Sequence, residues 1–261
     1  MSVLIALILG IVQGLTEFLP VSSSGHLMLI ENIFNIHSGG MFFNVLLHFA
    51  TLIAIVIVFW KDVVYLIKNP FSEEMKKIVV ATIPTVIIAL LVETFFDEFS
   101  LMAFVGFGFL ISSIVISITA FYMNRKRTIN YKSLNYKNSL IIGLIQGLAV
   151  FPGISRSGST ICAGLVQGIR REESAKFSFL ISVPVILGGM IFELIDGVKY
   201  GFGDVNVLVC VVGFISAFIV ALFTIKFMMN VVKNGNWWWF AVYLLILSIV
   251  VLLNQYIFCW F

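Results

Sequence analysis

Long apolar runs dominate this chain and restrict what it can fold into. A transmembrane α-helix needs about 20 predominantly apolar residues. Six stretches meet that length, at roughly 42–60, 78–96, 101–123, 175–196, 205–225 and 237–257. The chain of 261 residues is 61% hydrophobic and 11% charged, with a mean hydropathy of +1.10, whereas a soluble domain carries about 25% charged residues. The sequence therefore predicts an all-α integral membrane protein with six transmembrane helices.

The remaining composition argues against other classes of protein. No long polar segment is left for a soluble domain, so residues 1–261 are expected to form a single membrane domain. The net charge is only +3, and basic residues are not interleaved with aromatic ones, so nucleic-acid binding is not expected. No Lys or Arg precedes Lys61, so the N-terminus lacks the basic region of a signal peptide. Cys162, Cys210 and Cys259 lie singly in apolar spans, as small core residues do.

Two further regions, 1–40 and 139–172, are apolar but interrupted by polar residues and prolines. The first contains "EFLPVSSSGHL" (17–27) and the second "FPGISRSGST" (151–160). Polar, non-helical backbone at membrane depth is tolerated only where it is buried in protein or lines a cavity. These regions are therefore predicted to be re-entrant broken helices.

The two interrupted regions are also copies of one another. At an offset of 133, "GIVQGLTEFLPVSSSG" (10–25) aligns without gaps with "GLIQGLAVFPGISRSG" (143–158). The identical pairs are Gly10/Gly143, Gln13/Gln146, Gly14/Gly147, Leu15/Leu148, Phe18/Phe151, Ser22/Ser155, Ser24/Ser157 and Gly25/Gly158. The chain is thus predicted to consist of two repeated halves, about 1–123 and 139–257.

The spacing of the copies predicts an inverted-topology repeat. Three expected spans, an odd number, separate the copies, so the second must enter the membrane from the opposite face, and sites in such repeats lie at the repeat interface. This layout puts fourteen basic residues on one face, and they are Lys61, Lys68, Lys76, Lys77, Arg125, Lys126, Arg127, Lys132, Lys137, Arg170, Arg171, Lys176, Lys226 and Lys233. The opposite face has Lys199 with Asp97, Glu98 and Asp204. The positive-inside rule then predicts both termini outside and a site that opens outward.

Charged groups at membrane depth require an explanation. A charged side chain at the centre of a transmembrane helix costs about 2.5–3.5 kcal/mol on insertion scales, so Glu17 and Arg156 are expected to be functional or, alternatively, a structural ion pair. Gln13 and Glu17 lie four residues apart on one helix face. Their oxygens suit a hard divalent cation, Mg²⁺ or Ca²⁺, shared with substrate phosphates. Gln13 has a structural alternative, a hydrogen bond across the repeat.

Hydroxyls and glycines at both tips suit the binding of an anion. They precede predicted helix starts, where free N–H groups and the helix dipole attract negative charge, and capping alone explains one serine per tip. The candidates for substrate binding are Gln13, Ser22, Ser24, Gly25, Ser155, Ser157, Gly158 and Thr160. Arg156 supplies a fork for a phosphate, and His26 a proton carrier. His37 and His48, outside the polar motifs, are expected to be structural.

Two classes of function fit a phosphate-bearing ligand in a membrane, a phosphatase and a transporter (flippase) of a polyprenyl phosphate or another anion. A transporter does not need a carboxylate, a histidine and a spare serine that converge on one phosphate, although a proton-coupled one has a use for them. A scaffold subunit predicts no such convergence. Phosphatases of the phosphatidic-acid type are excluded because their nucleophilic histidine follows the arginine by six residues, where this chain has Cys162.

The motifs "QGLTEFLPVSSSGH" (13–26) and "FPGISRSGST" (151–160) resemble the signatures of the undecaprenyl-diphosphate phosphatase family, the bacitracin resistance proteins. "FFNVLLHFATLIAIVIVFW" (42–60) and "FSFLISVPVILGG" (177–189) are also similar to family sequence, so the resemblance covers essentially the whole chain. It implies hydrolysis of undecaprenyl diphosphate at the outer face of the bacterial plasma membrane, which recycles the lipid carrier for peptidoglycan synthesis. It also implies a divalent cation and resistance to bacitracin, an antibiotic that competes by binding the lipid substrate.

The resemblance assigns catalytic roles to Glu17, Ser23, His26 and Arg156. The chain departs from many members at Gln13, where they have Glu, so Glu17 is expected to carry the acidic role alone. Either Ser23 or a cation-bound water is the nucleophile, and the sequence leaves both open. It also leaves open whether the chain forms a homodimer.

Overall fold

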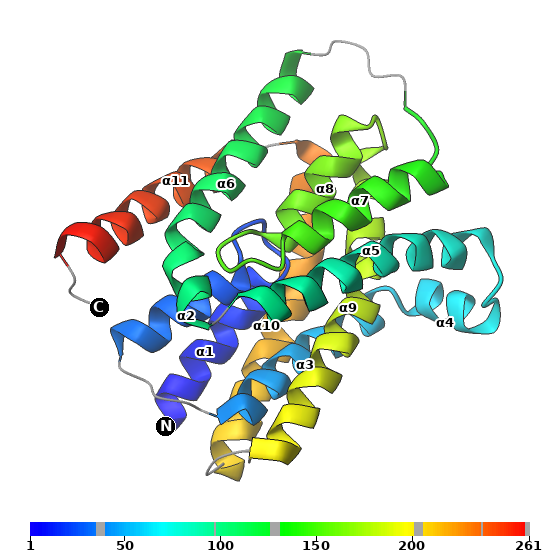
Figure 1. Ribbon diagram of the computed structural model, residues 1–261. Coiled ribbons are helices and arrows are strands. Elements are labelled where there is room, and N and C mark those ends of the chain that lie inside the picture. Colours follow the sequence, from blue (N-terminus) through cyan, green and yellow to red (C-terminus); the bar gives the residue numbers. More distant parts are fainter. Residues whose placement is uncertain (35–39, 97, 126–130, 201–205, 236, 259–261) are drawn as a thin grey trace.

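The computed structural model describes residues 1–34, 40–96, 98–125, 131–200, 206–235 and 237–258 (Figure 1). Apart from one isolated bridge between Lys132 and Ile169, every regular element in these ranges is a helix. The all-α prediction is therefore confirmed. Several residues that entered the sequence predictions lie outside the described ranges, and they are His37, Asp97, Lys126, Arg127, Asp204 and Cys259.

Five helices are long and apolar enough to cross a membrane. They are α5 (Glu73–Phe95), α6 (Glu98–Arg125), α9 (Arg171–Tyr200), α10 (Val207–Asn234) and α11 (Trp238–Leu253), which a short π-helix, η1 (Asn254–Phe258), continues. The predicted span 42–60 corresponds to α3 (Gly40–Val58), which bends by 86° into α4 (Trp60–Lys68). The described part of the chain thus has five candidate spans, or six if the bent pair counts as one, and it is a multi-pass membrane protein.

The two interrupted regions form pairs of short helices, as predicted. The first pair is α1 (Val3–Thr16) and α2 (Ser23–Ile33), and the second is α7 (Tyr136–Leu148) and α8 (Arg156–Val166). The longest of the four has 14 residues, fewer than the roughly 20 needed to cross a bilayer. Each broken pair is followed by three long helices, with α4 as an extra element in the first half.

Glycines let the first helix of each broken pair approach a long helix of the other half. Gly10 of α1 lies against the carbonyl of Gly213 in α10, and Gly143 of α7 lies against the backbone of Ala81 in α5. A Cβ atom at either glycine would clash with that backbone. Small residues at such contacts are the usual means by which helices pack closely in membranes.

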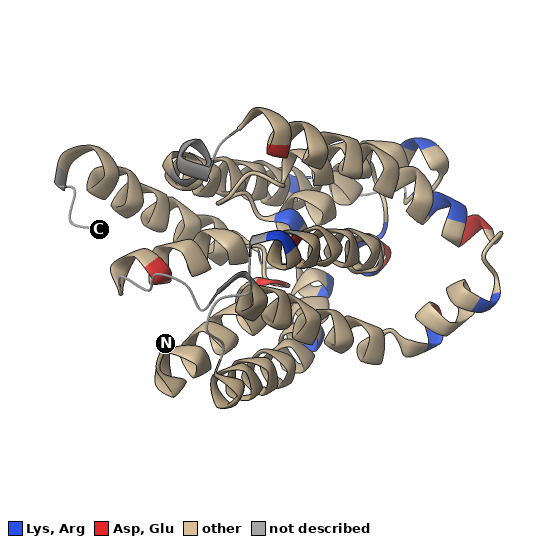
Figure 2. Ribbon diagram, turned by 60° about the horizontal axis from the view of Figure 1, so that its bottom comes forward, with Lys and Arg blue, Asp and Glu red and all other residues tan. Residues whose placement is uncertain are grey.

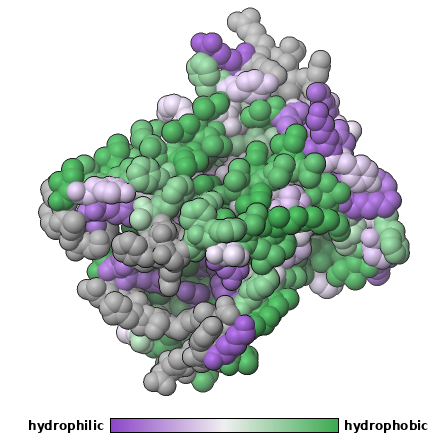
Figure 3. Space-filling model, in the orientation of Figure 1, coloured by the Kyte–Doolittle hydropathy of each residue, from purple (hydrophilic) through white to green (hydrophobic). Residues whose placement is uncertain are grey.

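The surface has the character expected of a protein in lipid. Ile118 and Phe223 are 61% and 71% exposed, and apolar side chains form a broad area in the middle of the face shown in Figure 3. A soluble monomer rarely exposes apolar patches of more than a few hundred Å². Many of the Lys and Arg residues gather at the end of the molecule away from both chain termini (Figure 2).

The close packing at Gly143 predicts that a side chain at this position destabilises the protein. Gly143→Ala should lower the melting temperature in detergent by several degrees, because the added methyl group meets the backbone of Ala81, and overpacking costs about 1–3 kcal/mol. Gly188→Ala is the matched control, since a Cβ there meets nothing within 4 Å. Equal melting temperatures for the two variants would contradict this account of the α5–α7 contact.

Candidate active site

The tip of the first broken region is a tight turn between Glu17 and Ser23. Ser22 caps α2, with its Oγ accepting a hydrogen bond from the Gly25 N–H at 3.4 Å. Ser22 has a φ of +68° and is the one residue other than glycine with positive φ in the described part of the chain. Such backbone costs about 1–3 kcal/mol and persists where the surroundings enforce it, often at active sites. Beyond this turn, the Ser23 hydroxyl donates a hydrogen bond to Glu17 Oε2 at 2.6 Å.

The tip of the second broken region has the same capping arrangement with different chemistry. Ser155 caps α8 and accepts a hydrogen bond from the Gly158 N–H at 3.1 Å. Its own N–H donates to Ser112 Oγ of α6 at 2.8 Å, which attaches the tip to a long helix. Arg156, the first residue of α8, occupies the position that Ser23 occupies in the other copy.

The two tips are in direct contact. The Ser157 hydroxyl donates to the Leu19 carbonyl at 2.9 Å, and a Cβ at Gly158 would lie 2.9 Å from Cβ of Pro20. In the reciprocal contact, a Cβ at Gly25 would lie 3.1 Å from the Cα of Gly153. The N-termini of α2 and α8 therefore converge, so their dipoles favour negative charge at one place.

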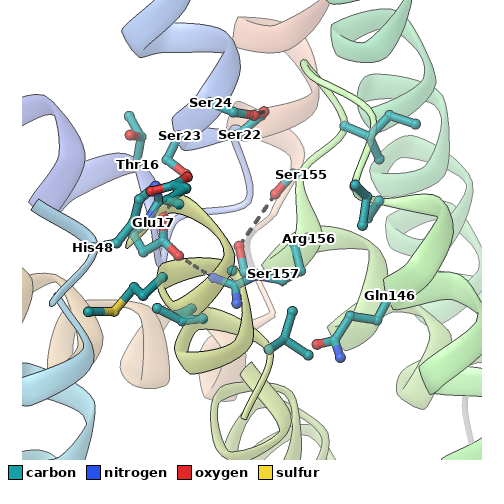
Figure 4. Close-up of a pocket in the computed structure, with 18 residues that line it drawn as sticks. Thr16, Glu17, Ser22, Ser23, Ser24, His48, Gln146, Ser155, Arg156 and Ser157 are labelled. Atoms are coloured by element: carbon teal, nitrogen blue, oxygen red, sulfur yellow. Dashed lines mark hydrogen bonds and ion pairs between the residues drawn. The ribbon is translucent and has the colours of Figure 1, made fainter. Parts of the chain in front are cut away.

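The Glu17 carboxylate joins the two tips (Figure 4). Its Oε1 forms an ion pair with the Arg156 guanidinium. Its Oε2 accepts hydrogen bonds from Ser23 at 2.6 Å and from Gln13 Nε2 at 3.0 Å. Glu17 is only 5% exposed, so the carboxylate is buried with both oxygens engaged. The ion pair considered as a structural alternative is therefore present, and it lies within the predicted functional cluster.

A cavity of about 190 Å³ opens beside this ion pair. Seven predicted site residues line it, namely Glu17, Ser22, Ser23, Ser24, Ser155, Arg156 and Ser157. Figure 4 shows that they come from both tips and face a common space. Val185, Ile186 and Met190 of α9 give the cavity an apolar wall. The arrangement combines a hydroxyl, a carboxylate and a guanidinium with apolar surface, which suits an amphipathic phosphate ester.

The other predicted site residues contact the tips without lining the cavity. The imidazole of His26 bonds through Nδ1 to the Ser22 carbonyl at 2.7 Å and through Nε2 to the Tyr243 hydroxyl at 2.6 Å. Thr160 donates to the Arg156 carbonyl at 2.8 Å and also contacts Ser178 of α9. Gln13 contacts Glu17 from within its own helix, and Gly25 and Gly158 form the contacts between the tips.

Two polar residues that the motifs did not indicate also line the cavity, namely His48 and Glu193, together with Gln146, the repeat partner of Gln13. His48 of α3, expected to be structural, has Nδ1 3.1 Å from Gln13 Nε2 and 3.9 Å from Glu17 Oε2. Gln146 donates to Thr85 Oγ1 at 3.1 Å. The sequence could have indicated His48 and Glu193 by their position, because polar and ionisable residues inside apolar spans usually serve a function.

A divalent cation has ligands here only if the substrate supplies some of them. Within the described ranges no group of three His, Cys, Asp or Glu residues is arranged to hold a metal. Buried oxygens of Gln13, Gln146 and Glu193 nevertheless have no hydrogen-bond partner. Mg²⁺ is often held by one or two carboxylates together with substrate phosphates. The donor set fits that mode, with Glu17 and Gln13 as the ligands predicted from the sequence.

Comparison with known proteins shows the family of the chain. Residues 6–250 match the family of the bacitracin resistance protein BacA. This chain belongs to that family. It is 39% identical to undecaprenyl-diphosphatase 3 of Bacillus cereus over 98% of both chains. It is also 39% identical to the undecaprenyl-diphosphatase of Halothermothrix orenii, over 99% of this chain and 100% of the relative. The matched range includes both tips and every residue that lines the cavity.

Proposed function

We propose that this protein is an undecaprenyl-diphosphate phosphatase that releases the terminal phosphate of its lipid substrate. The observation that carries the proposal is the contact of Ser23, Glu17 and Arg156 where two half-helix N-termini converge. The family and the names of the relatives point to the same reaction. The product, undecaprenyl phosphate, returns to cell-wall synthesis. Bacitracin acts on this step by binding the lipid diphosphate, so abundant enzyme gives resistance.

The cavity provides for both parts of this substrate. The diphosphate lies against the serines of the tips and Arg156, which line one side. The first prenyl carbons lie against the apolar wall of α9, and the rest of the tail stays in the bilayer. Because the Arg156 guanidinium already bonds to the buried carboxylate of Glu17, an entering phosphate competes for the same fork. Binding of substrate therefore releases Glu17 from one of its partners.

Ser23 is the proposed nucleophile. Its hydroxyl already donates to Glu17 Oε2 at 2.6 Å, so the carboxylate accepts the proton as Oγ bonds to the terminal phosphorus. The bridging P–O bond breaks, undecaprenyl phosphate leaves, and water hydrolyses the phosphoserine. Arg156 and the tip N–H groups stabilise the charge on the phosphoryl oxygens, the main task in this chemistry. In the alternative, water attacks directly and Ser23 only binds phosphate.

Two supporting roles complete the proposal. A divalent cation, Mg²⁺ or Ca²⁺, held by Glu17 and Gln13 with substrate phosphates, neutralises negative charge when bound. His26, the proton carrier expected from the resemblance, is bonded to the Ser22 carbonyl at 2.7 Å. Its contact with the site is indirect, because its Nε2 bonds to the Tyr243 hydroxyl and its ring does not line the cavity.

The proposed topology is an inverted repeat with both termini outside and a cavity that opens outward. Reciprocal contacts support a two-fold relation between the halves, since Gly25 meets Gly153 and Gly158 meets Pro20, and these pairs correspond at the offset of 133. A two-fold relation makes contacts reciprocal in this way. The gathering of Lys and Arg away from the termini (Figure 2) supports a cytoplasmic location for that end.

The activity itself is the first test. Purified protein in detergent should release inorganic phosphate from a long-chain prenyl diphosphate, with loss of activity in a chelator and recovery with Mg²⁺ or Ca²⁺. Ser23→Ala should remove the activity and Ser24→Ala, at an exposed position, should reduce it far less. Transfer of intact lipid phosphate between leaflets without phosphate release would establish the transporter instead. Substantial activity in Ser23→Ala would assign the attack to water.

Arg156→Lys separates a phosphate clamp from a structural cation. Lysine keeps the charge beside Glu17 but cannot offer two parallel donors to a phosphoryl group. We expect a melting temperature near that of the native protein and a loss of about a hundredfold in kcat, the scale for a lost transition-state donor. Arg156→Ala, which leaves Glu17 without its ion pair, should lose stability as well. Native turnover in the lysine variant would refute the clamp.

Single cysteines test the orientation in a chain whose own cysteines are replaced. Asn32→Cys and Asn206→Cys should react with an impermeant thiol reagent in intact cells. Lys68→Cys and Lys132→Cys should react only after lysis, because both lie on the face predicted to be cytoplasmic. The reverse pattern would overturn the orientation and leave the repeat unaffected.

A further inference from the structure

His48 lines the cavity, although it belongs to neither tip. It comes from α3, and its side chain is 29% exposed. Its Nδ1 atom lies 3.1 Å from Gln13 Nε2 and 3.9 Å from Glu17 Oε2. The imidazole therefore lies beside both Gln13 and Glu17, the two residues that the sequence predicts as cation ligands.

The neighbours of Gln13 determine which way its amide points. Gln13 is fully buried, and its side-chain nitrogen donates to Glu17 Oε2 at 3.0 Å. The flipped amide would direct its oxygen at the carboxylate, and two acceptors without a proton between them repel. The amide orientation thus follows from the hydrogen-bond network. The same nitrogen faces His48 Nδ1, so Nδ1 must accept a hydrogen bond and the imidazole proton must lie on Nε2.

We infer that Gln13 and His48 form one hydrogen-bonded unit that positions the Glu17 carboxylate. With both amide hydrogens used, Gln13 supports Glu17 from one side while Ser23 and Arg156 bond to it from others. His48 is a positioning residue in this arrangement and touches no reacting atom. Without its acceptor, one Gln13 hydrogen is left buried and unpaired, and the amide turns to satisfy it. Such an unpaired buried group costs about 1–3 kcal/mol.

The pairing also restricts which side chains can stand together at residues 13 and 48. An amide at this position needs an acceptor at residue 48, and the neutral imidazole supplies one. A carboxylate at residue 13 has no hydrogen to donate and would need a donor at residue 48 instead. The chemical identity of residue 48 is therefore tied to that of residue 13, although the two lie in different helices, α1 and α3. This inference rests on the proposed phosphatase function for its kinetic consequences only.

The first experiment is a double-mutant cycle in purified protein, with phosphate release from a prenyl diphosphate as the assay. Gln13→Met and His48→Leu should each lower kcat about tenfold, the scale for loss of a residue that orients a catalytic group. The double variant should be no more than about twofold worse than the poorer single variant, because the two residues act together. Additive losses, about a hundredfold together, would overturn the unit.

Conservative replacement provides the rescue. In His48→Asn the side-chain oxygen falls near the place of Nδ1 and accepts from Gln13, so most of the turnover lost in His48→Leu should return. Phe49→Leu, the next residue of α3, does not line the cavity and controls for general effects on the helix. If Asn and Leu at position 48 were equally poor at native melting temperature, the accepted hydrogen bond would not be the contribution of His48.

The tautomer of His48 gives a readout that is independent of activity. In ¹⁵N-histidine-labelled protein, assigned with His48→Asn, the His48 Nδ1 signal should be that of an unprotonated nitrogen that accepts a hydrogen bond. Gln13→Met should shift it, with little effect on the other two histidines. A protonated Nδ1 would overturn the inference even in active protein. Failure of phosphate release in native protein with the expected spectrum would refute the proposed function and leave the Gln13–His48 pair standing.

Discussion

The buried ion pair between Glu17 and Arg156 requires the fold to bring two charged residues from different halves of the chain together. Neither group is stable alone at membrane depth, because an unpaired charge there costs several kcal/mol. The two residues come from different halves of the chain, and Ser23 and Gln13 satisfy the second carboxylate oxygen. The breaks between α1 and α2 and between α7 and α8 allow both charges to reach the same point. The short lengths of α1, α2, α7 and α8 follow from that requirement.

The contact between the two helix breaks requires small residues. At the tips, Gly25 and Gly158 let the turns touch, since a Cβ atom at either would press on the opposite tip. Glycines elsewhere on α1 and α7 seat these short helices against long ones, which replaces the stability that a full span would have. The positive φ of Ser22 fits the same picture, because a residue held in such backbone needs firm surroundings. The tips are thus held together by close backbone contacts.

Much of the site could be predicted from the sequence because its parts lie in two short motifs. The repeat at an offset of 133 indicated a site at the interface of the two halves, and the cost of burying charge singled out Glu17 and Arg156. The same reasoning did not find His48 or Glu193, because they belong to long apolar helices. Their approach to the tips depends on the rotation of α3 and α9, which no local pattern determines. The rule applied to Glu17, that ionisable residues within apolar spans are functional, would have found both.

Other details depended on packing and could not be read from residue order. His26 and Ser23 belong to the same motif at the start of α2, yet His26 bonds to the Tyr243 hydroxyl and of the two only Ser23 lines the cavity. Thr160 shares a motif with Arg156 but contacts α9. The 86° bend between α3 and α4 likewise occurs within a run that looks like one apolar span. In each case the side-chain position or the helix bend depends on contacts with helices that are distant in sequence.

The repeat explains how one scaffold supports asymmetric chemistry. Equivalent positions at the start of α2 and α8 hold Ser23 and Arg156, and both side chains line the same cavity. A symmetric pair of serines would leave Glu17 unpaired, and a pair of arginines would leave the site without a hydroxyl. With one of each, the carboxylate bonds to both, accepting from the hydroxyl on Oε2 and from the guanidinium on Oε1. The chemistry follows from two differences between the copies, Ser23 opposite Arg156 and Glu17 opposite Val150, because the backbone already provides two converging helix N-termini for an anion.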